Sequence, residues 1–181
     1  MTQDDPRKHH RRSIRLRGWD YRAPAYYFVT ICTHQRQCFF DEPSLADIAA
    51  QTLLNLPHQP HAQHVALDEW VVMPNHVHAI LVFTDFPAHA DLSKKQEGFR
   101  NALAGSLGVV VGQYKSQVTR VVNGKGGVGG KLWQRGYYER IIRDEREWRA
   151  TQTYIRNNPA RWAEDRENLD GLLSKMTRRG G

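Results

Sequence analysis

The chain has 181 residues, of which 40% are hydrophobic, and its 26 Lys and Arg against 19 Asp and Glu give a net charge of +7. This length suits one domain with a sizeable core and excludes a large second domain. No apolar run approaches about 20 residues, and the first residues, MTQDDPRKHHRR, contain no apolar segment, so we expect no membrane span, no secretory signal and a cytoplasmic location. The basic excess favours a polyanionic partner, although a solvated basic surface would give the same charge.

The first part of the chain predicts an arm, a strand and a helix. Residues 1–23 are polar and basic and read as an N-terminal arm. AYYFVTICTH (25–34) predicts a strand. SLADIAAQTLLNL (44–56) predicts an amphipathic helix, with Ser44 as its N-cap and Pro57 ending it. The following HQPHAQH is expected to be a loop, because a proline between its first two histidines opposes a helical metal-binding face.

A pair of strands is expected next. LDEWVVM and VHAILVF are rich in Val, Ile, Trp and Phe, and Pro74 and Asn75 separate them as a tight turn would. His76 and His78 then lie at the beginning of the second strand. Side chains alternate between faces along a strand, so both imidazoles point the same way, with their bases about 6 to 7 Å apart. They could converge on one metal ion, or they could be two half-exposed histidines at a strand entrance.

The second half of the chain completes the set of elements. A helix is expected near 99–122, a strand or hairpin edge at 132–143, and a final helix at 144–158 that Pro159 stops. The order β-α-β-β-α-β-α predicts an α+β fold, a ferredoxin-like (split βαβ) antiparallel sheet with packed helices. The Gly-rich segment 123–130 lacks the spacing and flanks of a phosphate-binding loop and is expected to be a loop insertion. Residues 164–181 read as a peripheral tail, which leaves 24–163 as the domain.

Thiols and aromatic rings give two further indications. Cys32 and Cys38 match no CxxC or paired zinc spacing, so we expect reduced thiols. Aromatic residues lie among the basic ones, a mixture suited to stacking on unpaired bases while cations contact phosphates, although many of these rings must be core. These aromatic residues are Trp19, Tyr21, Tyr26, Tyr27, Trp133, Tyr137 and Tyr138.

The final helix offers partners for the histidine pair. Tyr154 and Asn158 are four residues apart, so they share one face of that helix, and an amide oxygen could join the two imidazoles around a cation while the phenol lies beside it. Two imidazoles and an amide oxygen suit Mg²⁺ or Mn²⁺ better than zinc. Tyr154 could instead be a core tyrosine with a satisfied hydroxyl. Tyr114 is the main competing tyrosine, but Val118, four residues on, cannot bind metal, so Tyr114 is expected to pack or to contact DNA.

The motifs taken together resemble a known family. MPNHVH, the later YIRNNPARW, the early YYFVTICTHQRQCFF and LWQRGYYERIIR between them resemble the single-tyrosine HUH (IS200-like) transposases, and most closely the REP-associated tyrosine transposases. The resemblance covers roughly residues 13 to 163. It implies an HUH-nuclease fold in which Tyr154 is the catalytic nucleophile and His76, His78 and Asn158 bind a divalent cation, Mg²⁺ or Mn²⁺.

The resemblance also implies a function. It predicts a nucleoid-associated bacterial enzyme that cleaves single-stranded DNA next to palindromic hairpins through a 5′-phosphotyrosine and rejoins strands without ATP; whether it is a homodimer is left open. DNA contacts are expected from Arg15, Arg17, Arg22, Lys115, Ser116 and Arg120. Two other classes stay open: a non-catalytic single-strand-binding module on the same fold, and a protein that uses a metal only structurally.

Overall fold

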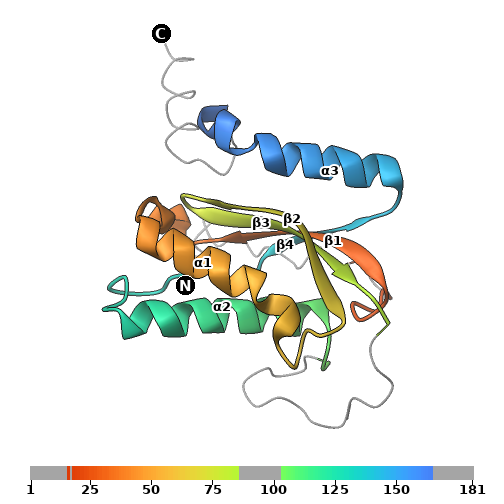
Figure 1. The fold of residues 1–181 in the computed structure, drawn as a ribbon, viewed down its shortest axis with the longest axis horizontal. Helices are drawn as coiled ribbons and strands as arrows, with labels where there is room; N and C mark the ends of the chain where they lie inside the picture. The colour runs from red at the N-terminus through yellow and green to blue at the C-terminus, as the bar shows by residue number, and fades with distance from the viewer. Residues whose placement is uncertain (1–15, 17, 86–102, 165–181) are drawn as a thin grey trace, which may run out of the picture.

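The computed structural model describes residues 16, 18–85 and 103–164. The elements in this part of the chain are β1 (Ala25–Cys32), α1 (Pro43–Leu54), β2 (Val65–Met73), β3 (His76–Phe83), α2 (Leu107–Gly124), β4 (Tyr138–Ile142) and α3 (Glu145–Asn157). The strands form an antiparallel sheet in the order β2-β3-β1-β4, with α1 and α2 on one face and α3 on the other (Figure 1). The expected order β-α-β-β-α-β-α and the α+β class are therefore confirmed.

The described chain also has four short 3₁₀ segments: η1 (His34–Arg36) and η2 (Phe39–Asp41) between β1 and α1, η3 (Leu56–His58) between α1 and β2, and η4 (Pro159–Glu164) after α3. The segment expected as the HQPHAQH loop contains the end of η3 and turns, with no long helix. The strands flanking the Pro74–Asn75 turn are β2 and β3, as expected. No described helix is long and apolar enough to cross a membrane.

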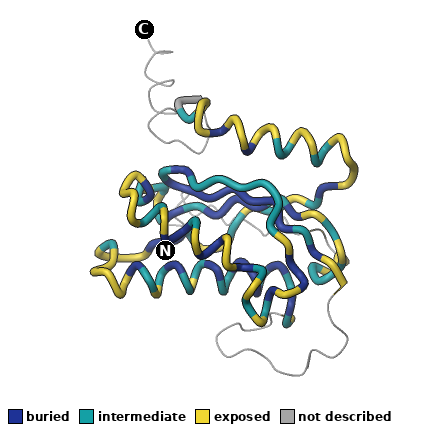
Figure 2. The backbone as a smooth tube through the Cα atoms, in the orientation of Figure 1, coloured by how far each residue is buried: buried dark blue, intermediate teal, exposed yellow. Residues whose placement is uncertain are grey.

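The alternation of β1 side chains divides the interior into two layers. Tyr27, Val29 and Ile31 are buried in the larger core, which α1 and α2 cover. Phe28 faces the other side and packs on a smaller core of Ile80, Ile142 and Ile155 under α3. Because both faces of the central strands are covered, β3 is buried along nearly its whole length, whereas most of α3 is exposed (Figure 2). Helix α3 thus packs on the sheet through few buried side chains.

The helix boundaries differ from expectation for local reasons. The N-cap of α1 is Glu42, whose side chain accepts a hydrogen bond from the Ser44 amide, and Pro43 takes the first helical position; Ser44 as N-cap was wrong. Helix α2 begins at Leu107, because Gly105 adopts a φ of 73° and Ser106 is the N-cap. Residues 99–102 of the expected helix lie outside the described residues.

The remaining connections agree in part with the sequence. Residues 125–130 form no helix or strand, as expected, but α2 continues through Asn123 and Gly124, so the first two residues of the predicted loop are helical. The strand expected at 132–143 is shorter: β4 begins at Tyr138 and lies at the sheet edge, and before it only Trp133 pairs, in an isolated bridge with Thr33. Asp144 caps α3 by accepting a hydrogen bond from the Glu147 amide at 2.8 Å. Cys32 and Cys38, which both lie in the described chain, form no disulfide bond. Most of the expected basic arm (1–15 and 17) and nearly all of the expected tail (165–181) lie outside the described residues.

Candidate active site

The two histidines that open β3 lie side by side. Their Nε2 atoms are 2.9 Å apart and their ring centroids 4.3 Å apart, with His76 0% and His78 1% exposed. Strand geometry alone places them on one face, because they are two residues apart. The two rings do lie together, and their burial rules out the alternative of two half-exposed histidines; binding of a metal ion by the pair stays a prediction.

Hydrogen bonds from neighbouring segments orient both rings through their Nδ1 atoms. The Nδ1 of His76 lies 2.8 Å from the side-chain oxygen of Asn75, and the Nδ1 of His78 lies 2.9 Å from the hydroxyl of Thr30, its register partner on β1. An amide oxygen only accepts, so the His76 proton is on Nδ1 and the Nε2 lone pair points at His78. The Thr30 hydroxyl donates or accepts, so it serves either tautomer of His78.

The surroundings keep His76 neutral. Burial, and secondarily the positive charge of Arg36, lowers the pKa of His76 to about 3. A neutral imidazole is the form that binds a metal ion. His76 is therefore held in the neutral form, with the lone pair of its Nε2 atom available.

Helix α3 presents Tyr154 to this pair. The Tyr154 hydroxyl is 3.4 Å from Nε2 of His78, and the tyrosine ring meets Phe28 edge-on at 6.0 Å between centroids. The residue is 41% exposed. This exposure contradicts the alternative of a core tyrosine.

Asn158 lies one helical turn after Tyr154 and is 3% exposed. Its Oδ1 atom is buried without a hydrogen-bond partner among the described residues. Trp162, four residues further on, has its ring 6.0 Å from that of His76, so the segment carrying Asn158 passes over the histidine pair. A buried amide oxygen without a partner is costly unless something binds it.

These donors fit a divalent cation. The described residues contain no group of three or more His, Cys, Asp or Glu side chains that could hold a metal, so a cation here depends on the amide oxygen of Asn158 in addition to His76 and His78. Two imidazoles and one amide oxygen leave further positions for water and a phosphate oxygen, as Mg²⁺ and Mn²⁺ prefer. Two imidazole nitrogens and one amide oxygen are thus donors of the kinds that such a cation accepts, and binding by His76, His78 and Asn158 stays a prediction.

A β-bulge in β2 attaches α3 to the sheet. The register between β2 and β3 shifts between Leu67 and Trp70, and the two intervening acids both bond to α3. Asp68 accepts hydrogen bonds from Nε1 of Trp148 and Nε2 of Gln152, and Glu69 pairs with Arg156. The bulge therefore helps to fix the helix that carries Tyr154 and Asn158.

The competing tyrosine is structural. Tyr114 is 1% exposed, its hydroxyl donates to the carbonyl of Ala49 at 3.2 Å, and burial raises its pKa. Its neighbour Lys115 donates from Nζ to the carbonyls of Gln134 at 2.6 Å and Gly136 at 3.0 Å, which fixes the loop before β4. Of the two expected roles for Tyr114, the structure gives packing.

The other expected DNA contacts are not gathered at the histidine pair. Ser116 and Arg120 are exposed on α2, across the sheet from α3 (Figure 1). Arg22 forms an ion pair with Asp20 at 2.8 Å. Arg15 and Arg17 lie outside the described residues. A role in DNA binding stays a prediction for all six residues, Lys115 included.

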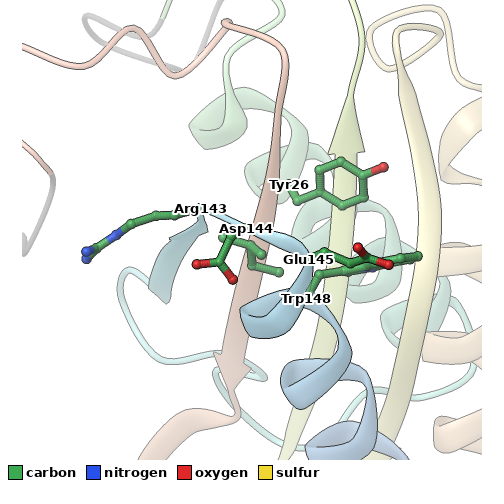
Figure 3. A pocket seen from close by; sticks show the side chains of 6 residues that line it. Tyr26, Arg143, Asp144, Glu145 and Trp148 are labelled. Atoms are coloured by element: carbon green, nitrogen blue, oxygen red, sulfur yellow. The ribbon is translucent and has the colours of Figure 1, made fainter.

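A separate pocket lies where β4 passes into α3. It has a volume of about 270 Å³ and is lined by Tyr26, Ile142, Arg143, Asp144, Glu145 and Trp148 (Figure 3). The rings of Tyr26 and Trp148 are 5.8 Å apart, and the Arg143 side chain extends away from them. It shares no residue with the group formed by the histidine pair, Tyr154 and Asn158.

Sequence reasoning missed the residues that support this group. Asn75 lies in the MPNHVH motif, but the motif predicts only a turn there and not the hydrogen bond to His76. Thr30 is 48 residues from His78 and becomes its partner only through the register of β1 with β3. Asp68 and Glu69 gave no sequence signal, because the bulge that turns both toward α3 interrupts the expected alternation.

Comparisons with known proteins place this geometry in context. No family model matches the chain. An uncharacterized protein of Haemophilus influenzae is 33% identical over 174 residues, which cover 90% of this chain and 95% of that protein. The chain belongs to one family with this Haemophilus protein.

A solved structure of a REP-associated tyrosine transposase bound to a REP hairpin superposes with a TM-score of 0.56 at 18% sequence identity, covering 81% of this chain and 73% of that one. The chain has the fold of the REP-associated tyrosine transposases. The HUH-type fold that the motif resemblance implied is thereby confirmed. A candidate transposase from Deinococcus radiodurans R1 is 23% identical and covers 79% and 95% of the two chains, but its TM-score of 0.43 carries no argument.

Proposed function

We propose that this protein is a metal-dependent single-stranded DNA endonuclease and strand transferase that cleaves next to palindromic hairpins through a 5′-phosphotyrosine. One observation carries the proposal: the hydroxyl of the exposed Tyr154 lies 3.4 Å from Nε2 of His78, which adjoins Nε2 of His76, and the buried Oδ1 of Asn158, one helical turn on, has no hydrogen-bond partner among the described residues. A nucleophile next to a cation-binding group is the arrangement that phosphoryl transfer needs. The fold and the basic composition support the same reading.

In the proposed reaction the Tyr154 oxygen attacks a backbone phosphorus of the DNA. The new Tyr O–P bond forms as the P–O3′ bond breaks, the phenol loses its proton, and the leaving 3′ oxygen takes up one. The 5′ end stays attached to the protein, so bond energy is conserved. Attack by another 3′-OH reverses the step and joins strands without ATP.

His76, His78 and Asn158 are the proposed ligands of Mg²⁺ or Mn²⁺. When bound, the cation supplies Lewis-acid polarisation of a phosphoryl oxygen. The contribution of the chain itself is orientation: Thr30 and Asn75 hold the imidazoles, and Phe28 with the helix attachment at Asp68 holds the tyrosine.

The DNA contacts and the domain division complete the proposal. Residues 24–163 form the catalytic domain, with 1–23 as a basic arm and 164–181 as a tail. Arg15, Arg17, Arg22, Lys115, Ser116 and Arg120 bind phosphates. The neighbouring transposase was solved with a REP hairpin, and we infer a hairpin with a single-stranded flank as the partner here. Phosphate binding by these cations predicts that affinity falls steeply with salt.

The test is a cleavage assay on a labelled single-stranded oligonucleotide that carries a palindrome from beside the protein's own gene. Wild type with Mn²⁺ or Mg²⁺ is expected to give a protein-linked band on a denaturing gel. Tyr154→Phe and His76→Ala are expected to abolish it, and Tyr114→Phe, at the buried competing tyrosine, to retain it. DNA retention without any covalent species, across several palindromes and both metals, would instead identify a binding module.

A further inference from the structure

The pocket between the end of β4 and the start of α3 opens on the same face of the sheet as Tyr154. Side chains alternate between faces along a strand, so Tyr26, Phe28 and Thr30 of β1 share one face. Thr30 bonds to His78, and the ring of Phe28 meets that of Tyr154 edge-on. Tyr26, which lines the pocket, therefore lies on the face that carries the proposed nucleophile.

The pocket is close enough to Tyr154 for one DNA strand to reach both. Trp148, the second ring of the pocket, precedes Tyr154 by six residues on α3, which corresponds to about 9 Å along the helix axis. Tyr26 and Thr30 are four residues apart on β1, which corresponds to about 13 Å. Stacked nucleotides of one strand rise by about 3.4 Å each. A strand whose phosphate meets Tyr154 therefore reaches the pocket within about four nucleotides.

The two aromatic rings suit a flat ligand. Tyr26 is 40% exposed, and its ring lies 5.8 Å from that of Trp148 at an angle of 59°, so the two rings are tilted rather than stacked on each other. The indole of Trp148 is held in place, because its Nε1 donates to Asp68 of the β2 bulge. A volume of about 270 Å³ is at the low end for small-molecule pockets, which suits a ligand as small as one base.

The charged residues of the pocket favour a base over a phosphate. Asp144 and Glu145 line it, and both have partners: Asp144 caps α3, and Glu145 pairs with Arg149. Their negative charges repel a phosphate, whereas the amino group of a base can donate to a carboxylate. The Arg143 side chain extends away from the two rings, where it can contact the phosphate of a nucleotide whose base is in the pocket (Figure 3).

We propose that this pocket binds one unpaired base of the single-stranded DNA flank, stacked on Tyr26 and Trp148. Among the aromatic residues expected to stack on bases, Tyr27 and Trp133 are buried, whereas Tyr26 is exposed beside a second ring. Stacking tolerates any base, so the pocket holds the strand in position more than it reads sequence. The inference rests on the proposed nuclease function and adds to it a subsite that positions the strand relative to Tyr154.

The first experiment moves an abasic site along the single-stranded flank of the oligonucleotide that carries the palindrome from beside the gene. The protein carries Tyr154→Phe, so the DNA stays uncleaved while its affinity is measured. We expect one sensitive position, within about four nucleotides of the cleavage site, at which removal of the base weakens binding about 5- to 150-fold. The neighbouring positions should change affinity by less than about threefold.

The second experiment assigns the sensitive position to Tyr26, in the same Tyr154→Phe background. Tyr26→Ala should weaken binding of the intact oligonucleotide by a similar factor, and should cost no further affinity once the base at that position is absent. Tyr26→Phe keeps the ring and should stay within about twofold. Tyr26 is the better probe of the two rings, because loss of the Trp148 indole also breaks its bond to Asp68.

A matched control removes another exposed apolar side chain. Leu54 is exposed at the end of α1, which covers the opposite face of the sheet (Figure 1). Leu54→Ala should leave affinity for every oligonucleotide within about twofold of the background protein.

Two results would overturn the inference. A flank without any sensitive position would show that the pocket holds no base. Equal losses caused by Tyr26→Ala on the intact and the abasic oligonucleotides would assign Tyr26 to the packing of α3. The nuclease fails separately: if Tyr26 and the sensitive base are coupled as expected but protein with Tyr154 intact forms no covalent adduct, the subsite stands and the cleavage reaction is refuted.

Discussion

The attachment of α3 to the β2 bulge predicts an unequal effect of two neighbouring acids. Asp68 accepts hydrogen bonds from Trp148 and Gln152, both partly buried, whereas Glu69 makes one exposed ion pair with Arg156. A hydrogen bond to a charged group contributes about 1.5 to 3 kcal/mol. Because Asp68 is only partly buried, we expect about 2 to 3 kcal/mol in total from its loss, against about 0 to 1 kcal/mol for Glu69.

This loss should appear mainly in α3 rather than in the whole fold. Ile155 is the one side chain of the helix that is buried, so the polar attachment is a large part of what holds α3 down. About 2 to 3 kcal/mol corresponds to an increase of roughly 30- to 150-fold in the undocked population, since 1.4 kcal/mol is a factor of ten. The central strands keep their own packing and should be affected less.

Amide hydrogen exchange followed by mass spectrometry measures this population directly. Asp68→Ala should accelerate exchange in residues 145–158 by roughly 30- to 150-fold, with a much smaller change in β1 and β3. Glu69→Ala, on the same bulge, should accelerate it by less than about fivefold. Equal effects of the two variants, or α3 exchange that matches global unfolding in wild type, would refute the reasoning.

Three further predictions concern the core, the metal ligands and pH. Urea denaturation should show that Ile155→Ala lowers the free energy of unfolding by about 2 to 5 kcal/mol and Ile155→Val by only about 0.5 to 1.5 kcal/mol. Equal losses in the two variants would contradict the placement of Ile155 in the core. Thr30→Val should weaken Mn²⁺ binding about 10- to 100-fold by calorimetry while Thr30→Ser preserves it, and retained affinity in the valine variant would dismiss the orienting role. Burial lowers the pKa of His64, although its bond to the Gly105 carbonyl opposes this, so the folded state binds fewer protons than the unfolded state below the ordinary value of 6.5. The folded state therefore loses stability as the pH falls below about 6.5, because the buried imidazole of His64 resists protonation. Between pH 8 and 5 the melting temperature should fall less steeply in His64→Gln than in wild type. Parallel melting profiles of the two proteins would contradict this role of His64.

Sequence pattern predicted the parts of the site that depend on local periodicity. A spacing of two on a strand was enough to bring His76 and His78 together, and a spacing of four on a helix put Tyr154 and Asn158 on one face. Val118 was enough to set Tyr114 aside, and the buried Tyr114 ring confirms its packing role. These inferences needed no knowledge of how the elements pack.

What depends on packing or on irregular backbone was not predictable. Thr30 meets His78 only because β1 and β3 pair in one register, and register is set across the whole sheet. The bulge at Asp68 breaks the local alternation and is held by distant residues. The Ser44 cap failed because a proline in front of it moved the start of the helix by one residue.

The most direct measurement of the central claim is the identity of the residue joined to DNA. Wild-type protein is incubated with Mn²⁺ and the cleavable oligonucleotide, digested with nuclease and trypsin, and analysed by mass spectrometry. The account predicts a peptide containing Tyr154 that carries a 5′-linked nucleotide phosphate. A linkage at another residue, such as Tyr138 or Tyr26, or cleavage that leaves no peptide modified, would contradict it.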